Sequence, residues 1–231
     1  MVLKGFLGLW MTVVIVLSIA LPMVPQPQVW YELPIIPGLE DRARIMFFHV
    51  PTAWLSALAF IVSMVYGIRY LKNREFDDDI KSSSAASVGL VFCVLATVTG
   101  SIWAKFNWGS FWNWDPRETS IFVLLLIYGA YFSLRSAIES EEKRAQLSAV
   151  YSIIAAVVMP FFLFIMPRIM AGLHPGSADD VNAGPVVSKG GMNSMMRVVL
   201  YSSVFGFIGV SYWIWNMLVR VRRLEARHSH Q

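Results

Sequence analysis

The sequence predicts an all-α integral membrane protein with six transmembrane helices. Of its 231 residues, 56% are hydrophobic and only 15% are charged, and the mean hydropathy is +0.56. Soluble domains of this length carry more charge. A helix needs about 20 apolar residues to cross the hydrocarbon core of a bilayer. The chain offers six uncharged runs of this order: Gly5–Pro22, Ile45–Ile68, Ser82–Ala104, Thr119–Leu134, Ala145–Pro167 and Val198–Val219.

The first and fourth runs need separate justification. Gly5–Pro22 could belong to a secretory signal peptide, but the residues that follow it make a poor cleavage site, so we expect a membrane helix. Thr119–Leu134 has only 16 residues. It follows Asp115-Pro116-Arg117-Glu118, which combines a preferred N-cap, a proline at the first helical position and the glutamate of a capping box. We therefore expect Asp115 and Glu118 to cap the fourth span, and this structural role is the simplest one for Asp115.

The distribution of basic residues predicts the orientation. Six spans place both termini on one side of the membrane, and that side carries 12 of the 19 lysines and arginines. The positive-inside rule then predicts cytoplasmic termini.

We expect a single domain over residues 1–231, with extracytoplasmic segments at 23–44, 105–118 and 168–197. The charged connection at 73–81 should be a solvated loop, and the basic tail 220–231, with His228 and His230, should be disordered. No basic face on a soluble element suggests a nucleic-acid partner.

A dense group of aromatic side chains begins at the end of the third run and continues toward the fourth. Six of the twelve residues 103–114 are aromatic, and they include four of the nine tryptophans of the chain. An aromatic belt at the membrane interface accounts for one or two such residues per helix end. The stretch instead predicts a stacking surface for a flat apolar ligand, although a belt is the simpler alternative.

Two histidines lie on the same side of the membrane as this stretch. His49 is the fifth residue of the second run, and His174 follows the fifth run by seven residues. A histidine in a hydrophobic run is usually functional, although a structural imidazole bonded to a carbonyl is the alternative. With the aromatic stretch, the pair predicts bis-imidazole ligation of haem iron. Zinc would call for further ligands, and Cys93 is the only cysteine. The basic residues nearby could pair with haem propionates or simply flank the membrane: Arg42, Arg44, Lys105, Arg117 and Arg168.

The segment Trp108-Gly109-Ser110-Phe111-Trp112-Asn113-Trp114-Asp115 resembles the tryptophan-rich "WWD" signature of haem-handling proteins in c-type cytochrome assembly. Over the whole chain the resemblance is to haem-handling protein C of the system I cytochrome c maturation pathway. That family has six spans and an external histidine in a His-Val-Pro context, matched by His49-Val50-Pro51. It has the signature between spans 3 and 4, and a second external histidine, matched by His174. Phe111 departs from the signature, which has tryptophan there. Residues 116–119 also resemble the larger system I ligase and system II synthetase, which have more spans.

The resemblance implies a haem carrier of the bacterial inner membrane, with its haem site on the periplasmic face and haem b as the transported ligand. His49 and His174 would be the axial ligands of the iron. The haem platform would comprise Trp108, Phe111, Trp112, Trp114 and Asp115. The carrier would pass haem to a periplasmic haem chaperone as a subunit of an ABC-type complex that also has a small membrane subunit. It would not be an enzyme, because ATP hydrolysis would belong to a partner.

Two other functions fit the residues less well. A haem lyase of the cytochrome c synthetase type would need a route for reductant, typically a second haem deeper in the membrane, and no histidine lies in the inner halves of the spans. A channel with an aromatic rim would need a polar face along one span, where the chain offers scattered serines and threonines.

Overall fold

The computed structural model describes residues 2–36, 38–174, 177–178 and 192–229. Within them, six helical segments are long and apolar enough to cross a membrane. Five are the helices α1 (Val2–Ala20), α2 (Met46–Asn73), α3 (Phe76–Trp108), α4 (Pro116–Ala137) and α7 (Ser194–Ser229). The sixth is α5 (Glu141–Pro160), which continues through a π-helical turn, Phe161–Ile165, into the short α6 (Met166–Ile169). The predicted all-α membrane fold with six spans is confirmed.

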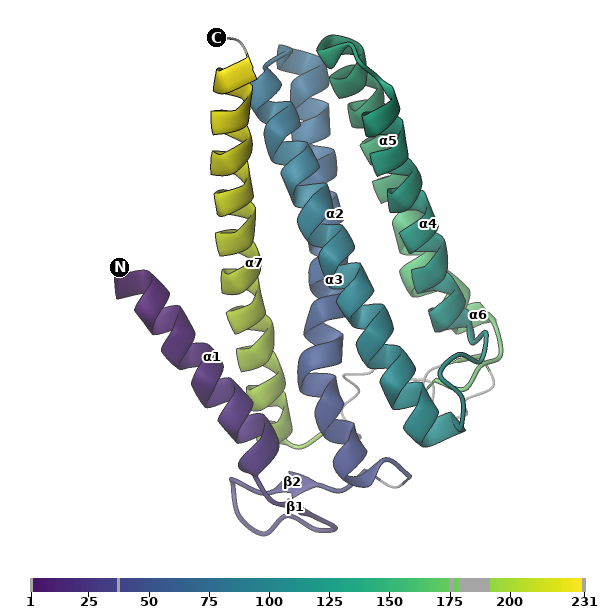
Figure 1. Ribbon diagram of the computed structural model, residues 1–231. Coiled ribbons are helices and arrows are strands. Elements are labelled where there is room, and N and C mark those ends of the chain that lie inside the picture. Colours follow the sequence, from purple (N-terminus) through teal and green to yellow (C-terminus); the bar gives the residue numbers. More distant parts are fainter. Residues whose placement is uncertain (1, 37, 175–176, 179–191, 230–231) are drawn as a thin grey trace.

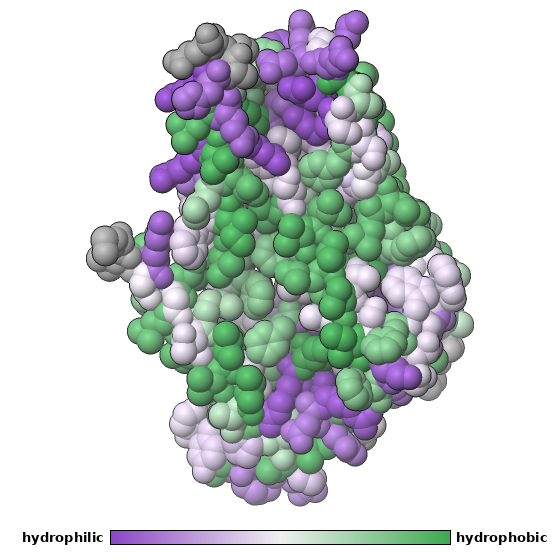
Figure 2. All heavy atoms as spheres, in the orientation of Figure 1, coloured by the Kyte–Doolittle hydropathy of each residue, from purple (hydrophilic) through white to green (hydrophobic). Residues whose placement is uncertain are grey.

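The connections between helices lie at two ends of the bundle (Figure 1). One end holds the short parallel strands β1 (Met23–Val24) and β2 (Leu33–Pro34), the 3-10 helix Glu40–Ile45, the α3–α4 connection and α6. We call it the site end. The far end holds the α2–α3 and α4–α5 connections and the last turns of α7. Hydrophilic residues gather at both ends and hydrophobic residues form a band between them (Figure 2), as expected for a bundle that spans a bilayer.

Small residues let α2 lie close to its neighbours. A Cβ at Gly67 would come within 2.6 Å of the Ser152 hydroxyl of α5, and one at Gly89 of α3 would meet the ring of Phe60. That ring stacks on Tyr128 of α4 with 3.3 Å between centroids. Close backbone approach through glycine and serine is typical of membrane helices, whose association lacks a hydrophobic drive. By contrast α1 packs mainly against α7 and leans away from the other long helices (Figure 1).

Bidentate ion pairs connect α3 to two other helices, α4 and α7, at the far end. The guanidinium of Arg135 on α4 donates two hydrogen bonds to Asp79, at 2.6 and 2.8 Å. Arg223 on α7 does the same to Asp77, at 2.6 and 2.9 Å. These carboxylates lie in the first turn of α3, where negative charge also favours the helix dipole.

Two predictions for the far end are wrong. Residues 73–81 are not a loop, because α3 already begins at Phe76, where its three aspartates find cationic partners. The tail from Arg220 is not disordered, because α7 continues to Ser229. Arg223 and Arg222 reach back to α3, where Arg222 donates to Ser83 and Ser87, and these contacts hold the additional turns. His230 lies outside the described residues.

Candidate functional site

The aromatic stretch begins on a helix instead of forming a single loop. α3 continues through Trp108 and ends at Gly109, whose φ of +83° a glycine adopts without strain. Cationic side chains cover the carbonyl oxygens of this last turn. Lys105 donates to the Gly109 carbonyl at 2.9 Å, and Arg42 donates to the Phe106 carbonyl at 2.6 Å. Both basic residues therefore cap the carboxyl end of α3 in this structure.

His49, in the first turn of α2, packs its imidazole against α3. Its Nδ1 lies 3.0 Å from the hydroxyl of Thr99, and that hydroxyl donates to the Leu95 carbonyl at 2.7 Å. Because a hydroxyl has one proton, the Thr99 oxygen accepts a hydrogen bond from Nδ1. A neutral His49 therefore carries its proton on Nδ1, and the lone pair of Nε2 is available. Gly100 allows this contact, since a Cβ there would lie 2.9 Å from His49 Cε1.

His174 lies in the segment that follows α6, between two tryptophan rings of α3. Its ring stacks on Trp103 with 5.7 Å between centroids and meets Trp108 edge to face at 4.6 Å. Its Nδ1 lies 2.7 Å from Asp115 Oδ1. An ionised carboxylate only accepts hydrogen bonds, so Nδ1 is the donor. His174, like His49, therefore offers Nε2 as a lone-pair donor.

Asp115 connects α4 to the segment that carries His174. Its carboxylate accepts the backbone N–H of Arg117 at 2.9 Å and of Leu173 at 2.7 Å, as well as the imidazole of His174. Burial raises the pKa of this carboxyl, but the hydrogen bonds with His174 and with the two amides outweigh burial and lower the pKa to about 2. Asp115 is therefore ionised at physiological pH. Gly172 permits the close approach, since a Cβ there would lie 2.7 Å from Asp115 Oδ2.

The predicted capping box is present at the start of α4, with Asp115 as N-cap and Glu118 as its partner. Glu118 also fixes a strained residue. Trp114 has a φ of +57°, in the left-handed region, which costs an L-residue roughly 1–2 kcal/mol. The amides on both sides of it, of Asn113 and Asp115, donate to Glu118 Oε2 at 2.7 and 3.3 Å. The box therefore holds the backbone on both sides of an indole that is 67% exposed.

The two imidazoles contact the same face of α3. His49 contacts Thr99 and Gly100, and His174 stacks on Trp103. Positions three and four apart are neighbours on a helix surface, so the two contacts are about one turn, roughly 5 Å, apart along the axis. His49 and His174 also lie within electrostatic range of each other. The structure thus brings together two histidines that are 125 positions apart in the chain.

The five residues of the predicted platform lie in three different surroundings. Trp108 and Asp115 contact His174, as described above. Trp112 and Trp114 instead pack edge to face on Phe122 of α4, with centroids 6.1 and 6.2 Å away. Phe111 is exposed, and Lys105 Nζ lies 5.6 Å from its ring centroid.

The named site residues omitted three residues that contact the histidines, Thr99, Gly100 and Trp103, and one that lies against Asp115, Gly172. The signal for three of them was the spacing of Thr99, Gly100 and Trp103 on one helical face. All three lie within the predicted third run, Ser82–Ala104, so the sequence contained this signal. Of the basic residues, Arg44 pairs with Asp41 and Arg168 donates to the Phe164 carbonyl. Arg117 lies within electrostatic range of both His49 and Asp115.

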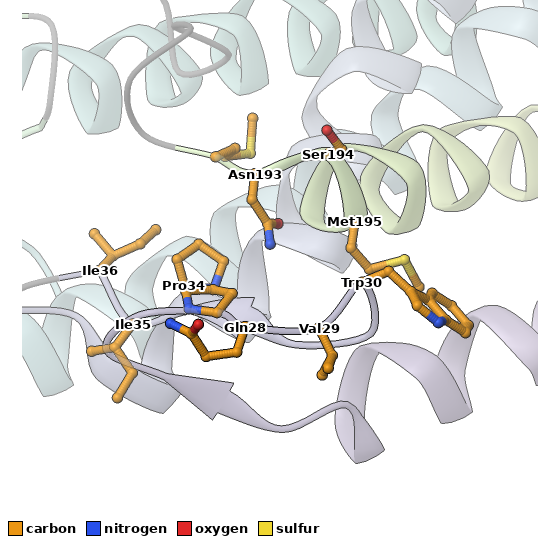
Figure 3. A pocket seen from close by; sticks show the side chains of 11 residues that line it. Gln28, Val29, Trp30, Pro34, Ile35, Ile36, Asn193, Ser194 and Met195 are labelled. Atoms are coloured by element: carbon orange, nitrogen blue, oxygen red, sulfur yellow. The ribbon is translucent and has the colours of Figure 1, made fainter.

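A separate hollow at the site end is lined mostly by apolar side chains from the proline-rich segment and the start of α7 (Figure 3). Asn193 holds the two parts together, since its amide donates to the Glu32 carbonyl at 2.8 Å and its side-chain oxygen accepts the Met196 amide. None of the predicted site residues lines this hollow.

Comparison with known proteins gives a family model and several relatives whose descriptions agree with one another. A family model described as "Heme exporter protein C" matches residues 4–231. A heme exporter protein C from Rhodobacter capsulatus is 30% identical over 207 residues, covering 88% of this chain and 84% of that protein. One from Paracoccus denitrificans is 30% identical over 179 residues, covering 78% and 71%. A ccmC-like mitochondrial protein of cytochrome c biosynthesis from Marchantia polymorpha is 32% identical over 124 residues, covering 54% and 52%. Because the family model matches almost the entire chain, this multi-pass membrane protein belongs to the heme exporter protein C family.

Proposed function

We propose that this chain binds haem b at its site end through His49 and His174 and passes it on during cytochrome c maturation. One observation carries the proposal. Each imidazole has its Nδ1 engaged, by Thr99 or by Asp115, so that each neutral ring offers Nε2 to a metal. Metal-ligating histidines almost always use their second nitrogen in this way.

The surroundings of the histidines suit haem in particular. Iron in a porphyrin already has four ring nitrogens and needs two axial donors, which is the number of imidazoles gathered here. In the described part of the chain, no three His, Cys, Asp or Glu side chains form a metal-binding group. Trp103 and Trp108 flank His174, and Phe111 and Trp114 are exposed nearby in sequence, so apolar rings are available to a flat macrocycle. Aromatic stacking contributes about 1–3 kcal/mol per contact in the comparable case of nucleic-acid bases.

The sequence and the family membership support further details of this proposal. Twelve basic residues on the side of the termini support a periplasmic site end in the bacterial inner membrane. A site at the end of the bundle suits transfer to a periplasmic haem chaperone. The membrane complex in which this happens would be of the ABC type, with ATP hydrolysis in a partner subunit. We infer a carrier and not a lyase because the only other described histidine, His228, is at the far end of α7, so that the described chain offers one ligand pair.

Absorption spectra of the purified protein test the assignment. The wild type should retain haem with the spectrum of a low-spin, six-coordinate iron. His49→Ala and His174→Ala should each lose the low-spin spectrum and at least ten-fold in haem content, since one axial ligand is missing. His228→Ala, at the far end, is the matched control and should behave as wild type. An unchanged spectrum in both site variants would refute the ligand assignment.

A further inference from the structure

The two histidines differ in the group that accepts their Nδ1 proton. His174 donates to the carboxylate of Asp115 at 2.7 Å, whereas His49 donates to the neutral hydroxyl of Thr99 at 3.0 Å. Hydrogen bonds to an ionised acceptor are roughly twice as strong as those between neutral groups. A carboxylate at Nδ1 also raises the basicity of the opposite nitrogen and therefore strengthens it as a metal ligand.

The remaining contacts add to this difference. The backbone of His174 is held as well as its ring, because its carbonyl accepts the Ser177 hydroxyl at 2.7 Å and the amide of Leu173 donates to Asp115. Trp103 and Trp108 contact the ring from two directions. The ring of His49 donates to the Thr99 hydroxyl and rests on the backbone at Gly100.

We infer that Asp115 and Thr99 are positioning residues that make the two axial ligands unequal. Asp115 makes His174 the stronger ligand, which keeps the haem, and Thr99 leaves His49 as the ligand that exchanges when haem is passed on. The inference rests on the proposed function. In the exchange, the bond from iron to His49 Nε2 breaks and a lone pair of the incoming donor takes its place. One neutral nitrogen donor replaces another, so no electron is transferred and no proton is required.

Cavity variants with added ligands test this directly. His49→Gly and His174→Gly each leave a space that free imidazole can fill as an axial ligand. Imidazole can donate an N–H to Thr99 or Asp115, whereas 1-methylimidazole cannot. We expect imidazole to be preferred over 1-methylimidazole by roughly 10–100-fold in His174→Gly, and by only a few-fold in His49→Gly. Adding Asp115→Asn to His174→Gly should remove most of the preference. Equal preferences in the two cavities, or a larger one in His49→Gly, would overturn the inference.

Variants that keep both histidines provide a second measurement that does not depend on a cavity. Cyanide should replace the weaker axial ligand of the ferric protein, and the rate of replacement is measured in the absorption spectrum. Thr99→Val should speed the replacement about ten-fold or more, and Thr99→Ser, which keeps the hydroxyl, should restore the wild-type rate. If Thr99→Val leaves the rate unchanged, the inference fails. Asp115→Asn can be compared with Thr99→Val in the same cyanide measurement, because asparagine is as good an N-cap as aspartate and should preserve the start of α4. Its matched control is Glu118→Gln, which neutralises the other carboxylate of the same capping box.

The two proposals fail in different ways. If the wild type lacks a low-spin spectrum, or keeps it in both His49→Ala and His174→Ala, the proposed function is wrong. If the spectra behave as expected but the two cavities do not differ, the histidines are ligands of equal strength and only the present inference is wrong.

Discussion

His49 can lie against α3 only because residue 100 has no side chain. An added Cβ would come within 2.9 Å of Cε1 of the imidazole, so the ring would have to move by a few tenths of an ångström. That displacement would also lengthen the bond to Thr99, which fixes the tautomer of His49.

Gly100→Ala should therefore weaken haem binding without harming the fold. Alanine stabilises a helix by up to about 1 kcal/mol relative to glycine, while the displaced imidazole should lower haem affinity roughly ten-fold. Haem titration followed in the Soret band measures the affinity, and thermal unfolding in detergent measures the stability. Gly129→Ala on α4 is the matched control, because an added Cβ there meets nothing within 4 Å. Equal affinities in the two variants would contradict the role of Gly100.

The carboxylate of Asp115 makes the stability depend on pH in a defined direction. Its pKa falls from 3.8 to about 2 in the folded protein. A group with a lowered folded pKa contributes stability that is fully present above the unfolded value, here about pH 4, and is lost as the pH falls through about 2. The difference in unfolding free energy between wild type and Asp115→Asn should thus be on the order of 2 kcal/mol at pH 6 and shrink below pH 4. A difference that stays constant from pH 6 to pH 2 would argue against an ionic bond.

Asp115 has two roles, as N-cap of α4 and as hydrogen-bond acceptor of His174, and only the first was predictable from the sequence. The order Asp-Pro-Arg-Glu specifies an N-cap and a capping box through local geometry, and the structure confirms both. The hydrogen bond to His174 spans 59 positions, and no local pattern reports a contact across that separation. For the same reason the sequence placed two histidines on one side of the membrane but not on one face of α3.

At the level of elements, α3 shows why the boundaries of apolar runs are poor guides to helix ends. The run Ser82–Ala104 is bounded by charged residues, but α3 extends from Phe76 to Trp108. Its aspartates lie in the first turn and Lys105 in the last, positions that suit the helix dipole. Charge ended the predicted segment where the physical helix continues. Residues 105–108, including Trp108, were therefore assigned to a connecting segment although they belong to the last turn of α3.

The start of α4 should be sensitive to Glu118. Glu118→Ala removes the acceptor for the amides of Asn113 and Asp115 and should destabilise the protein by about 0.5–2 kcal/mol. Hydrogen exchange at these two amides should become faster, because their hydrogen bonds are lost. Glu118→Gln keeps an acceptor oxygen and should show little change. Wild-type exchange at both amides in Glu118→Ala would mean that water already satisfies them.

In the molecule as a whole, α3 links the site end to the far end. The sequence predicted the number of spans and their order, because apolar length and composition are local properties. It did not predict which helices are neighbours, because that depends on pairs such as Asp79 with Arg135, which are 56 positions apart. Both side chains of this pair are largely buried, with exposures of 10% and 15%.

Removing one partner of the Asp79–Arg135 pair should lower the stability of the protein more than removing both. Asp79→Asn leaves a buried guanidinium without its carboxylate and should destabilise the protein by about 3–5 kcal/mol, whereas a double replacement by apolar residues is often nearly neutral. We expect Asp79→Leu/Arg135→Leu to recover most of the thermal stability that Asp79→Asn loses. Because the pair lies at the far end, the recovered protein should keep the wild-type haem spectrum. A double variant as unstable as Asp79→Asn would show that the charges themselves are needed.

The length of α7 sets the height of its last turns above the bilayer. Its 36 residues correspond to about 54 Å at the rise of an α-helix, against a hydrocarbon core of about 30 Å. The basic turns beyond Arg220 therefore stand outside the lipid as a stiff rod, pinned by Arg223 to Asp77. A fluorophore attached near the end of this rod should report one fixed distance from the headgroups, and not the broad distribution that a flexible tether gives.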